Sequence, residues 1–144
     1  MKIREVMTHR AIRISPEESA SVAARTMTHY NVGAMPVCGL DGKLCGMVTD
    51  RDIVTRCLAA GKQPGETRVE DIMTRGVISV RPDMETSQVA ALMARRQIRR
   101  LPVVEDGQLC GMVTLGDLSQ NEQTAPDAVD ALAEITGNVG HMEK

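Results

Sequence analysis

One short sequence that occurs twice constrains the fold of this chain more than any other feature. Leu-Cys-Gly-Met-Val-Thr stands at residues 44–49 and again at residues 109–114. An Asp-Gly pair precedes each copy, and each threonine is followed three residues later by an aspartate, Asp52 or Asp117. A verbatim repeat in a chain of 144 residues indicates a duplicated unit and predicts two similar halves packed together.

The repeat extends well beyond these six residues. A Met-Thr pair begins at Met7 and again at Met73, and Pro36 has its match in Pro102. One extra residue near Leu40 shifts the register in the first copy. The chain is therefore expected to consist of a first repeat, a linker, a second repeat and a tail, at residues 1–62, 63–68, 69–120 and 121–144.

The residue pattern of each repeat predicts a β-α-β-β-α unit, which belongs to the α/β (α+β) class. A short β-prone run closed by proline comes first, and a helical stripe of small and apolar residues follows it. An Asp-Gly turn then joins two further strands, and a helix follows the Thr-x-x-Asp sequence. The strands are expected at residues 11–14, 34–38 and 44–49, and at residues 76–80, 100–104 and 109–114. A repeat of this size favours pseudo-twofold packing of the two units.

The tail carries a separate helical pattern. Ala128, Val129, Leu132 and Ile135 are spaced as one face of a short amphipathic helix, which we expect to end at Gly137. Residues 140–144 are expected to fray. This helix would pack on the repeats or on a second subunit.

Composition excludes several classes of function. The chain has no Phe or Trp and one Tyr, so it offers almost no aromatic platform for stacking bases. Its net charge of −2 gives no general attraction to nucleic acid or to anionic membranes. No apolar run reaches the length of a membrane span or of a signal peptide, which favours a cytoplasmic protein. The four cysteines are expected to be buried, reduced thiols.

Catalytic and metal-binding patterns are missing from the sequence. His9, His29 and His141 are scattered and have no repeated acidic or cysteine partner. Nucleophile elbows, His-Glu-x-x-His pairs and Walker loops do not occur. We therefore expect neither an enzyme nor a bound metal or cofactor.

The Thr-x-x-Asp sequence carries the richest chemistry. It falls where a strand ends and a helix begins, so free backbone N–H groups and the helix dipole favour an anion there. Thr49 supplies a hydroxyl, Arg51 a positive charge, and Asp52 can accept two hydrogen bonds from the vicinal hydroxyls of a ribose. The alternative is that Asp50 and Asp52 only cap the helix. Capping explains less well why Thr-x-x-Asp recurs at Thr114 while the residues inside it change.

These motifs, in this order, resemble a tandem pair of cystathionine-β-synthase (CBS) domains, the Bateman module. The resemblance spans residues 1–120 and lies in the Met-Thr pairs, the Pro-Val strands and the Gly-(apolar)-Val-Thr-x-x-Asp end of each copy. Modules of this family regulate other proteins, and bind AMP, ADP, ATP, NAD-type dinucleotides or S-adenosylmethionine, or no ligand.

The resemblance also implies two nucleotide clefts, in which the aspartate holds the ribose and the threonine lies beside the phosphate. One cleft would use Arg13, Gly33, Ala34, Arg100, Thr114, Gly116 and Asp117, with Arg100 directed at the phosphate. The other would use Thr49, Asp50, Arg51, Asp52, Ser79 and Arg99. Ala34 stands where the second repeat has Arg100, and Gly116 where the first has Arg51, so equal affinities are not expected.

The sequence thus predicts a free-standing CBS pair that binds AMP, ADP or ATP and has no catalytic role. The resemblance implies a face-to-face homodimer, and the signal would reach an unknown effector protein in trans or through the tail helix. Three alternatives remain open: a dimerisation module with empty clefts, a binder of S-adenosylmethionine or NAD, and a nucleic-acid-binding regulator. The last would use the basic cluster Arg95, Arg96, Arg99 and Arg100.

Overall fold

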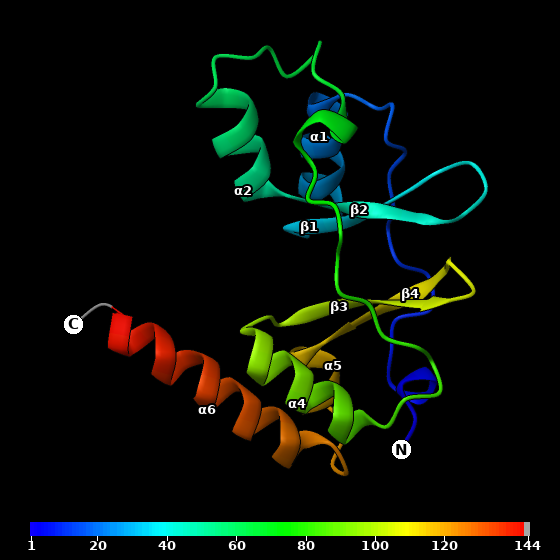
Figure 1. Cartoon of the computed structure of the whole chain (residues 1–144), viewed down its shortest axis with the longest axis vertical. Coiled ribbons are helices and arrows are strands. Elements are labelled where there is room, and N and C mark those ends of the chain that lie inside the picture. The colour runs from blue at the N-terminus through cyan, green and yellow to red at the C-terminus, as the bar shows by residue number, and fades with distance from the viewer. Residues whose placement is uncertain (143–144) are drawn as a thin grey trace. The chain divides into compact units, whose positions relative to one another are not determined.

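The computed structural model describes the backbone of residues 1–142 and the side chains of residues 1–137. It divides into two compact units, each described here by itself. The α1 unit comprises residues 11–77 and 106–109, and the α6 unit comprises residues 1–10, 78–105 and those from 110 onward. In chain order the elements are η1 (Ile3–Glu5), α1 (Ala20–Tyr30), β1 (Ala34–Cys38), β2 (Leu44–Thr49), α2 (Asp50–Asp52), η2 (Ile53–Leu58), α3 (Val69–Ile72), α4 (Thr86–Arg96), β3 (Arg100–Glu105), β4 (Gln108–Thr114), α5 (Leu115–Ser119) and α6 (Ala125–Met142) (Figure 1).

The predicted hairpins are confirmed, since β1 pairs with β2 and β3 with β4 in two small two-stranded sheets. Gly42 and Gly107 take positive φ angles of 81° and 80° in the Asp-Gly turns, as tight hairpin turns require. A bulge between Val37 and Cys38 lies close to the extra residue of the first repeat. Helices α1 and α2–η2 cover one face of the first hairpin, and α4 and α5 cover one face of the second, with α6 packed against α4 and α5 (Figure 1).

The strands expected at residues 11–14 and 76–80 are not formed. Each segment makes a single parallel bridge, Ile14 to Val37 or Val80 to Val103. Ile14 donates to the Pro36 carbonyl at 3.1 Å and accepts from the Cys38 N–H at 2.9 Å. A parallel ladder would next need an N–H from Pro36 on one side and from the proline that closes the run on the other, and proline has none. Prolines therefore limit the first element of both repeats to one bridge.

The tail helix is longer than predicted. Helix α6 continues through Gly137 to Met142, so the expected stop at Gly137 is wrong, while the expected fraying from residue 140 stays a prediction. A glycine ends a helix when it takes the left-handed conformation, and Gly137 has no positive φ. Within the helix a glycine only lowers stability by about 1 kcal/mol. Residues 143 and 144 lie outside the described part of the chain.

Each unit has its own hydrophobic core, and each core takes in the opening segment of the other repeat. Ile3 and Met7 are buried with the second repeat in the α6 unit. Ile72 and Met73 are buried with the first repeat in the α1 unit. The two repeats have therefore exchanged their opening segments.

Main-chain pairing fixes this exchange. The Thr8 N–H donates to the Met112 carbonyl at 2.8 Å and accepts the return bond at 3.0 Å. Thr74 and Met47 make the same reciprocal pair at 2.8 and 3.0 Å. The glycine inside each repeated hexapeptide leaves room for this close approach.

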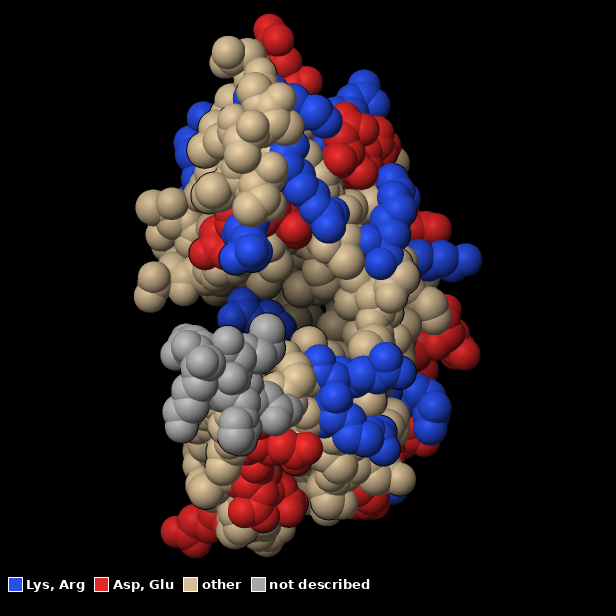
Figure 2. Space-filling view, turned by 60° about the vertical axis from the view of Figure 1, so that its left-hand side comes forward, with Lys and Arg blue, Asp and Glu red and all other residues tan. Residues whose placement is uncertain are grey.

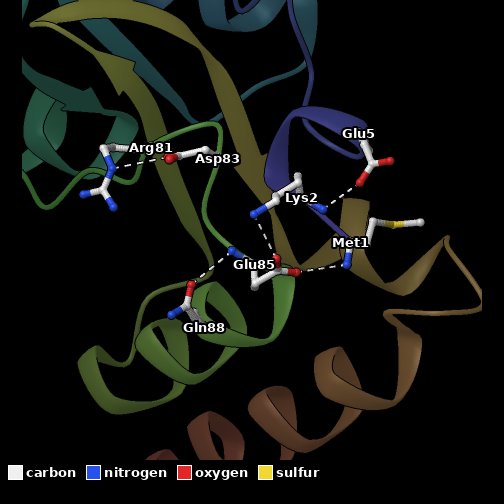
Figure 3. Close-up of polar contacts among 7 residues, drawn as sticks. All are labelled: Met1, Lys2, Glu5, Arg81, Asp83, Glu85 and Gln88. Carbon is white, nitrogen blue, oxygen red and sulfur yellow. Dashed lines mark hydrogen bonds and ion pairs between the residues drawn. The ribbon is translucent and has the colours of Figure 1, made fainter.

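A polar network joins the opening segment of the α6 unit to the start of α4 (Figure 3). The Glu85 carboxylate lies 3.0 Å from Lys2 Nζ and 3.1 Å from the N-terminal ammonium. The Glu85 N–H donates to Gln88 Oε1 at 3.1 Å, which satisfies one free donor at the helix start. The hydrogen bond from Lys2 is the main reason why the pKa of Glu85 lies below its ordinary value, and the hydrogen bond from the N-terminal ammonium is the second.

Removal of the Lys2 charge is expected to raise the pKa of Glu85. A folded-state pKa below the unfolded one stabilises the protein above the unfolded pKa, and this stabilisation is lost as the pH falls through the folded pKa. A carboxyl NMR titration of Lys2→Met should show the rise. Arg4→Met is the matched control, because Arg4 is an exposed cation of the same η1 turn. Equal shifts in both variants would contradict a specific Lys2 contact.

The cysteines are all free thiols, but they are not all buried. Cys38 and Cys57 are buried as expected, whereas Cys45 is exposed and Cys110 is partly buried. Burial raises the pKa of the Cys38 and Cys110 thiols. The expectation of a buried Cys45 is wrong because burial in β2 begins only at Gly46, after the hairpin end.

Candidate functional site

The two Thr-x-x-Asp sequences form the same structure at the start of α2 and α5. Thr114 Oγ1 accepts from the Asp117 N–H at 3.0 Å, and Asp117 Oδ2 accepts from the Thr114 N–H at 2.9 Å. Thr49 and Asp52 make the corresponding pair of bonds, both at 3.0 Å. Each pair is a reciprocal cap, so the capping role weighed above is present in both copies. The cap uses only Oδ2 of each aspartate, which leaves the second carboxylate oxygen for another partner.

In the α1 unit that second oxygen has a neighbour. Asp52 is 8% exposed, and its Oδ1 lies 3.7 Å from Arg56 Nε. The Asp50 N–H donates to the Gly33 carbonyl at 2.9 Å, and Ala34 pairs with Thr49 across the hairpin. Gly33, Ala34, Thr49, Asp50 and Asp52 therefore meet at one helix start.

In the α6 unit the same place is a pocket of about 360 Å³. The Leu115 N–H donates to the Arg99 carbonyl at 2.9 Å, the counterpart of the Asp50–Gly33 bond. Three residues predicted for this cleft, Arg100, Thr114 and Gly116, line the pocket, whereas Asp117 does not. Arg99, which was expected in the cleft of Thr49, lines this pocket as well, together with two further residues of α5 and three of α6. The lining residues are Arg99, Arg100, Thr114, Leu115, Gly116, Ser119, Ala128, Val129 and Leu132.

The two helix starts differ in charge. Leu115 in the α6 unit stands where the α1 unit has Asp50, so the α6 pocket has one acidic group fewer at the site of the cap. Arg99 and Arg100 add two cations to that pocket. The two helix starts are therefore not equivalent in charge, and the unequal affinities expected from the sequence stay a prediction.

Several predicted site residues stay predictions. Arg51 is exposed beside Asp50, and its N–H donates to Asp50 Oδ1 at 2.8 Å. Arg13 and Ser79 are also exposed. The resemblance implies that Arg13, Gly33 and Ala34 serve the same ligand as Thr114, yet they belong to the other compact unit.

Sequence reasoning missed the contribution of the tail. Val129 and Leu132 were recognised as apolar positions of a helix, but not as part of a pocket. Their spacing of three residues was the available signal, since it puts both side chains on one side of α6. Ser119 was missed because it follows the motif rather than lying within it.

Charge on the surface is mixed. Figure 2 shows several separate groups of basic side chains with acidic groups between them. Arg95 and Arg96 occupy the last turn of α4 and do not line the α6 pocket, whereas Arg99 and Arg100 do. Among the described residues, no helix is long and apolar enough to cross a membrane, and no cluster of three potential metal ligands occurs.

Comparisons with known proteins agree with this fold. The CBS domain family model matches residues 3–59 and 69–135. The CBS domain-containing protein YhcV of Bacillus subtilis is 40% identical over 134 residues, which are 93% of this chain and 94% of that protein.

Solved structures extend the likeness. The crystal structure of Hypoxic Response Protein I, with two coordinated zinc ions, has a TM-score of 0.77 at 31% identity over 84% of this chain and 98% of its own. The CBS domain pair of protein MJ0100, in complex with 5′-methylthioadenosine and S-adenosyl-L-methionine, has a TM-score of 0.73 at 30% identity over 83% of this chain and 94% of its own.

Proposed function

Because the chain belongs to the CBS-domain family, we propose that it is a non-catalytic regulatory module that binds an adenine nucleotide of the AMP, ADP or ATP type. The observation that carries the proposal is the α6 pocket, which gathers Arg99, Arg100, Thr114 and Gly116 from separate parts of the sequence. Its volume of about 360 Å³ is in the lower range of small-molecule sites. The arginines would bind the phosphate, because a guanidinium makes paired bonds to phosphate oxygens.

The remaining groups have complementary roles in this proposal. The hydroxyl of Thr114 lies beside the phosphate, and the free carboxylate oxygen of Asp117 accepts from the ribose hydroxyls. The site at Thr49 and Asp52 would bind the same class of ligand more weakly. Its arginine, Arg51, adjoins Asp50, and Gly33 and Ala34 stand where the second repeat has Arg99 and Arg100.

S-adenosylmethionine is a second adenosine-containing ligand to compare with the nucleotides. The CBS pair of protein MJ0100 was solved with S-adenosyl-L-methionine, which contains adenosine but no phosphate. The two arginines of the α6 pocket favour a phosphorylated ligand over a sulfonium cation. We therefore rank the nucleotides first.

Ligand binding would act by linkage. A ligand that prefers one arrangement of the module raises the population of that arrangement, and a partner protein reads the change. The proposal places the protein in the cytoplasm as a homodimer of CBS pairs that signals to an effector.

The proposal predicts a thermal shift with nucleotides. Ligand at 100 times its Kd stabilises the folded state by about 2.7 kcal/mol. In melting curves recorded with AMP, ADP, ATP, NAD and S-adenosylmethionine, the largest rise in melting temperature should come from AMP, ADP or ATP. No shift with any of the five would contradict the sensor role and favour a structural module.

The role of Asp117 is separable from its role as a cap. Asp117→Ala should weaken AMP binding roughly tenfold or more, since bonds to a charged acceptor contribute about 1.5–3 kcal/mol. The loss should disappear with 2′,3′-dideoxy-AMP, which lacks the hydroxyls that the carboxylate would hold. Asp52→Ala removes the equivalent cap in the other unit and is the matched control in calorimetry. Equal losses with AMP and its dideoxy analogue would contradict the ribose assignment.

A further inference from the structure

Helix α6 lines the pocket of the α6 unit, and the repeats themselves do not supply such a helix. Its buried side, Ala128, Ala131 and Ile135, packs into the core of the unit. Val129 and Leu132 lie along another edge of the helix and line the pocket together with Ala128. One element therefore contributes both to the core and to the candidate site.

The exposure of these two side chains marks this edge. Val129 is 63% exposed and Leu132 is 43% exposed, and both are among the few large apolar side chains left accessible in the described part of the chain. They line the same pocket as Arg99 and Arg100. The lining of the pocket thus combines cations with branched apolar groups. This pattern fits an anion that also carries an apolar surface, which on binding would cover the exposed side chains.

The α1 unit provides an internal comparison. The positions that correspond to the contacts of α6 lie on α1 and η2, where a groove of about 420 Å³ is lined by Ala24, Met27, Thr28 and Val54 among others. Val54 is 55% exposed there, and no helix of the described chain takes the place that α6 takes in its own unit. Among the described residues, a wall supplied by an additional helix is therefore found in the α6 unit and not in the α1 unit.

We infer that α6 is the outer wall of the nucleotide site at Thr114, and that Val129 and Leu132 contact the bound ligand. This inference rests on the proposed function and adds to it how binding of the ligand would be coupled to the docking of α6. A ligand that touches both α5 and α6 binds more tightly when α6 is docked, so ligand binding must stabilise the docked helix by the same factor. Helix α6 is then the element that reports occupancy.

A pair of opposite charges at one position tests the wall. Val129→Glu brings a carboxylate to the site of the phosphate and should weaken binding of the tightest of AMP, ADP and ATP roughly tenfold. Val129→Lys should leave the affinity unchanged or raise it. Ala133→Glu is the control, because Ala133 is exposed on the same helix outside the pocket. Because Val129 is mostly exposed, these changes should not unfold the helix.

Hydrogen exchange tests the coupling in the same samples. Saturating nucleotide should slow amide exchange in residues 128–135 of the original protein and much less in Val129→Glu. If the protein binds nucleotide but Val129→Glu, Val129→Lys and Ala133→Glu all bind it equally, with α6 exchange unchanged, the inference is wrong and the proposed function stands. If the original protein binds none of AMP, ADP and ATP, the proposed function itself is wrong.

Discussion

Gly111→Ala is expected to be among the most destabilising single substitutions in this chain, at about 3 kcal/mol, the upper end of the usual cost of overpacking. A Cβ at this position would overlap the Thr8 carbonyl group, which is backbone and cannot rotate away. Relief would require breaking the reciprocal bonds between Thr8 and Met112. For a domain of this size we expect the melting temperature to fall by about 6–12 °C.

The same substitution elsewhere controls for the loss of a glycine. Gly137 lies in α6, and among the described residues no atom outside its own helical turns lies within 4 Å of a Cβ built there. Gly137→Ala should therefore leave stability unchanged or raise it by up to about 1 kcal/mol. Gly46→Ala should resemble Gly111→Ala, since its Cβ would lie 2.5 Å from the Thr74 carbonyl oxygen. Chemical denaturation of the three variants measures the differences. A stable Gly111→Ala would mean that the opening segment can move away at little cost.

Arg100→Glu is expected to have the largest effect on ligand binding. It removes a phosphate ligand and puts a negative charge into the α6 pocket, where Arg99 alone would remain as a cation. Loss of the charge-assisted bond alone costs about 1.5–3 kcal/mol, and repulsion adds to it. Nucleotide affinity, measured by calorimetry, should therefore fall by roughly 100-fold or more. The melting temperature without ligand should change little, because Arg100 is exposed.

Arg95→Glu is the matched control, since Arg95 belongs to the same basic cluster but lies on α4 outside the pocket. It should leave nucleotide affinity within about twofold, because exposed charges at a distance are screened. The pair also tests the nucleic-acid alternative. Equal losses of salt-dependent retention on DNA in both variants, without any loss of nucleotide affinity, would favour a nucleic-acid surface over the proposed site.

Local chemistry made much of the fold predictable. The Asp-Gly pairs predicted both hairpins, and Thr-x-x-Asp predicted both helix starts, because each depends on a few adjacent residues. The prediction of the first strands was wrong partly for a reason that lies in another strand. Pro36 interrupts the ladder from the opposite side, so the β propensity of residues 11–14 could not reveal it.

The sequence could not predict which of the two identical hexapeptides each Met-Thr segment pairs with. Met7-Thr8 meets the same hexapeptide in either repeat, so the sequence does not show that it pairs with the second copy. The pocket wall of α6 was hidden for a similar reason. Periodicity identified Val129 and Leu132 as one side of a helix, but the surface that this side meets depends on tertiary packing.

The exchanged opening segments have a consequence for how the molecule assembles. In the observed arrangement, each hexapeptide pairs with the Met-Thr segment of the other repeat, so a single repeat contains neither of these two pairs. Two copies in one chain form both pairs reciprocally. The chain between them then sets the effective concentration of each segment for its strand, so completion of either core is unimolecular and independent of protein concentration. The duplication thus makes the exchange of opening segments an intramolecular step of folding, where two separate repeats would first have to associate.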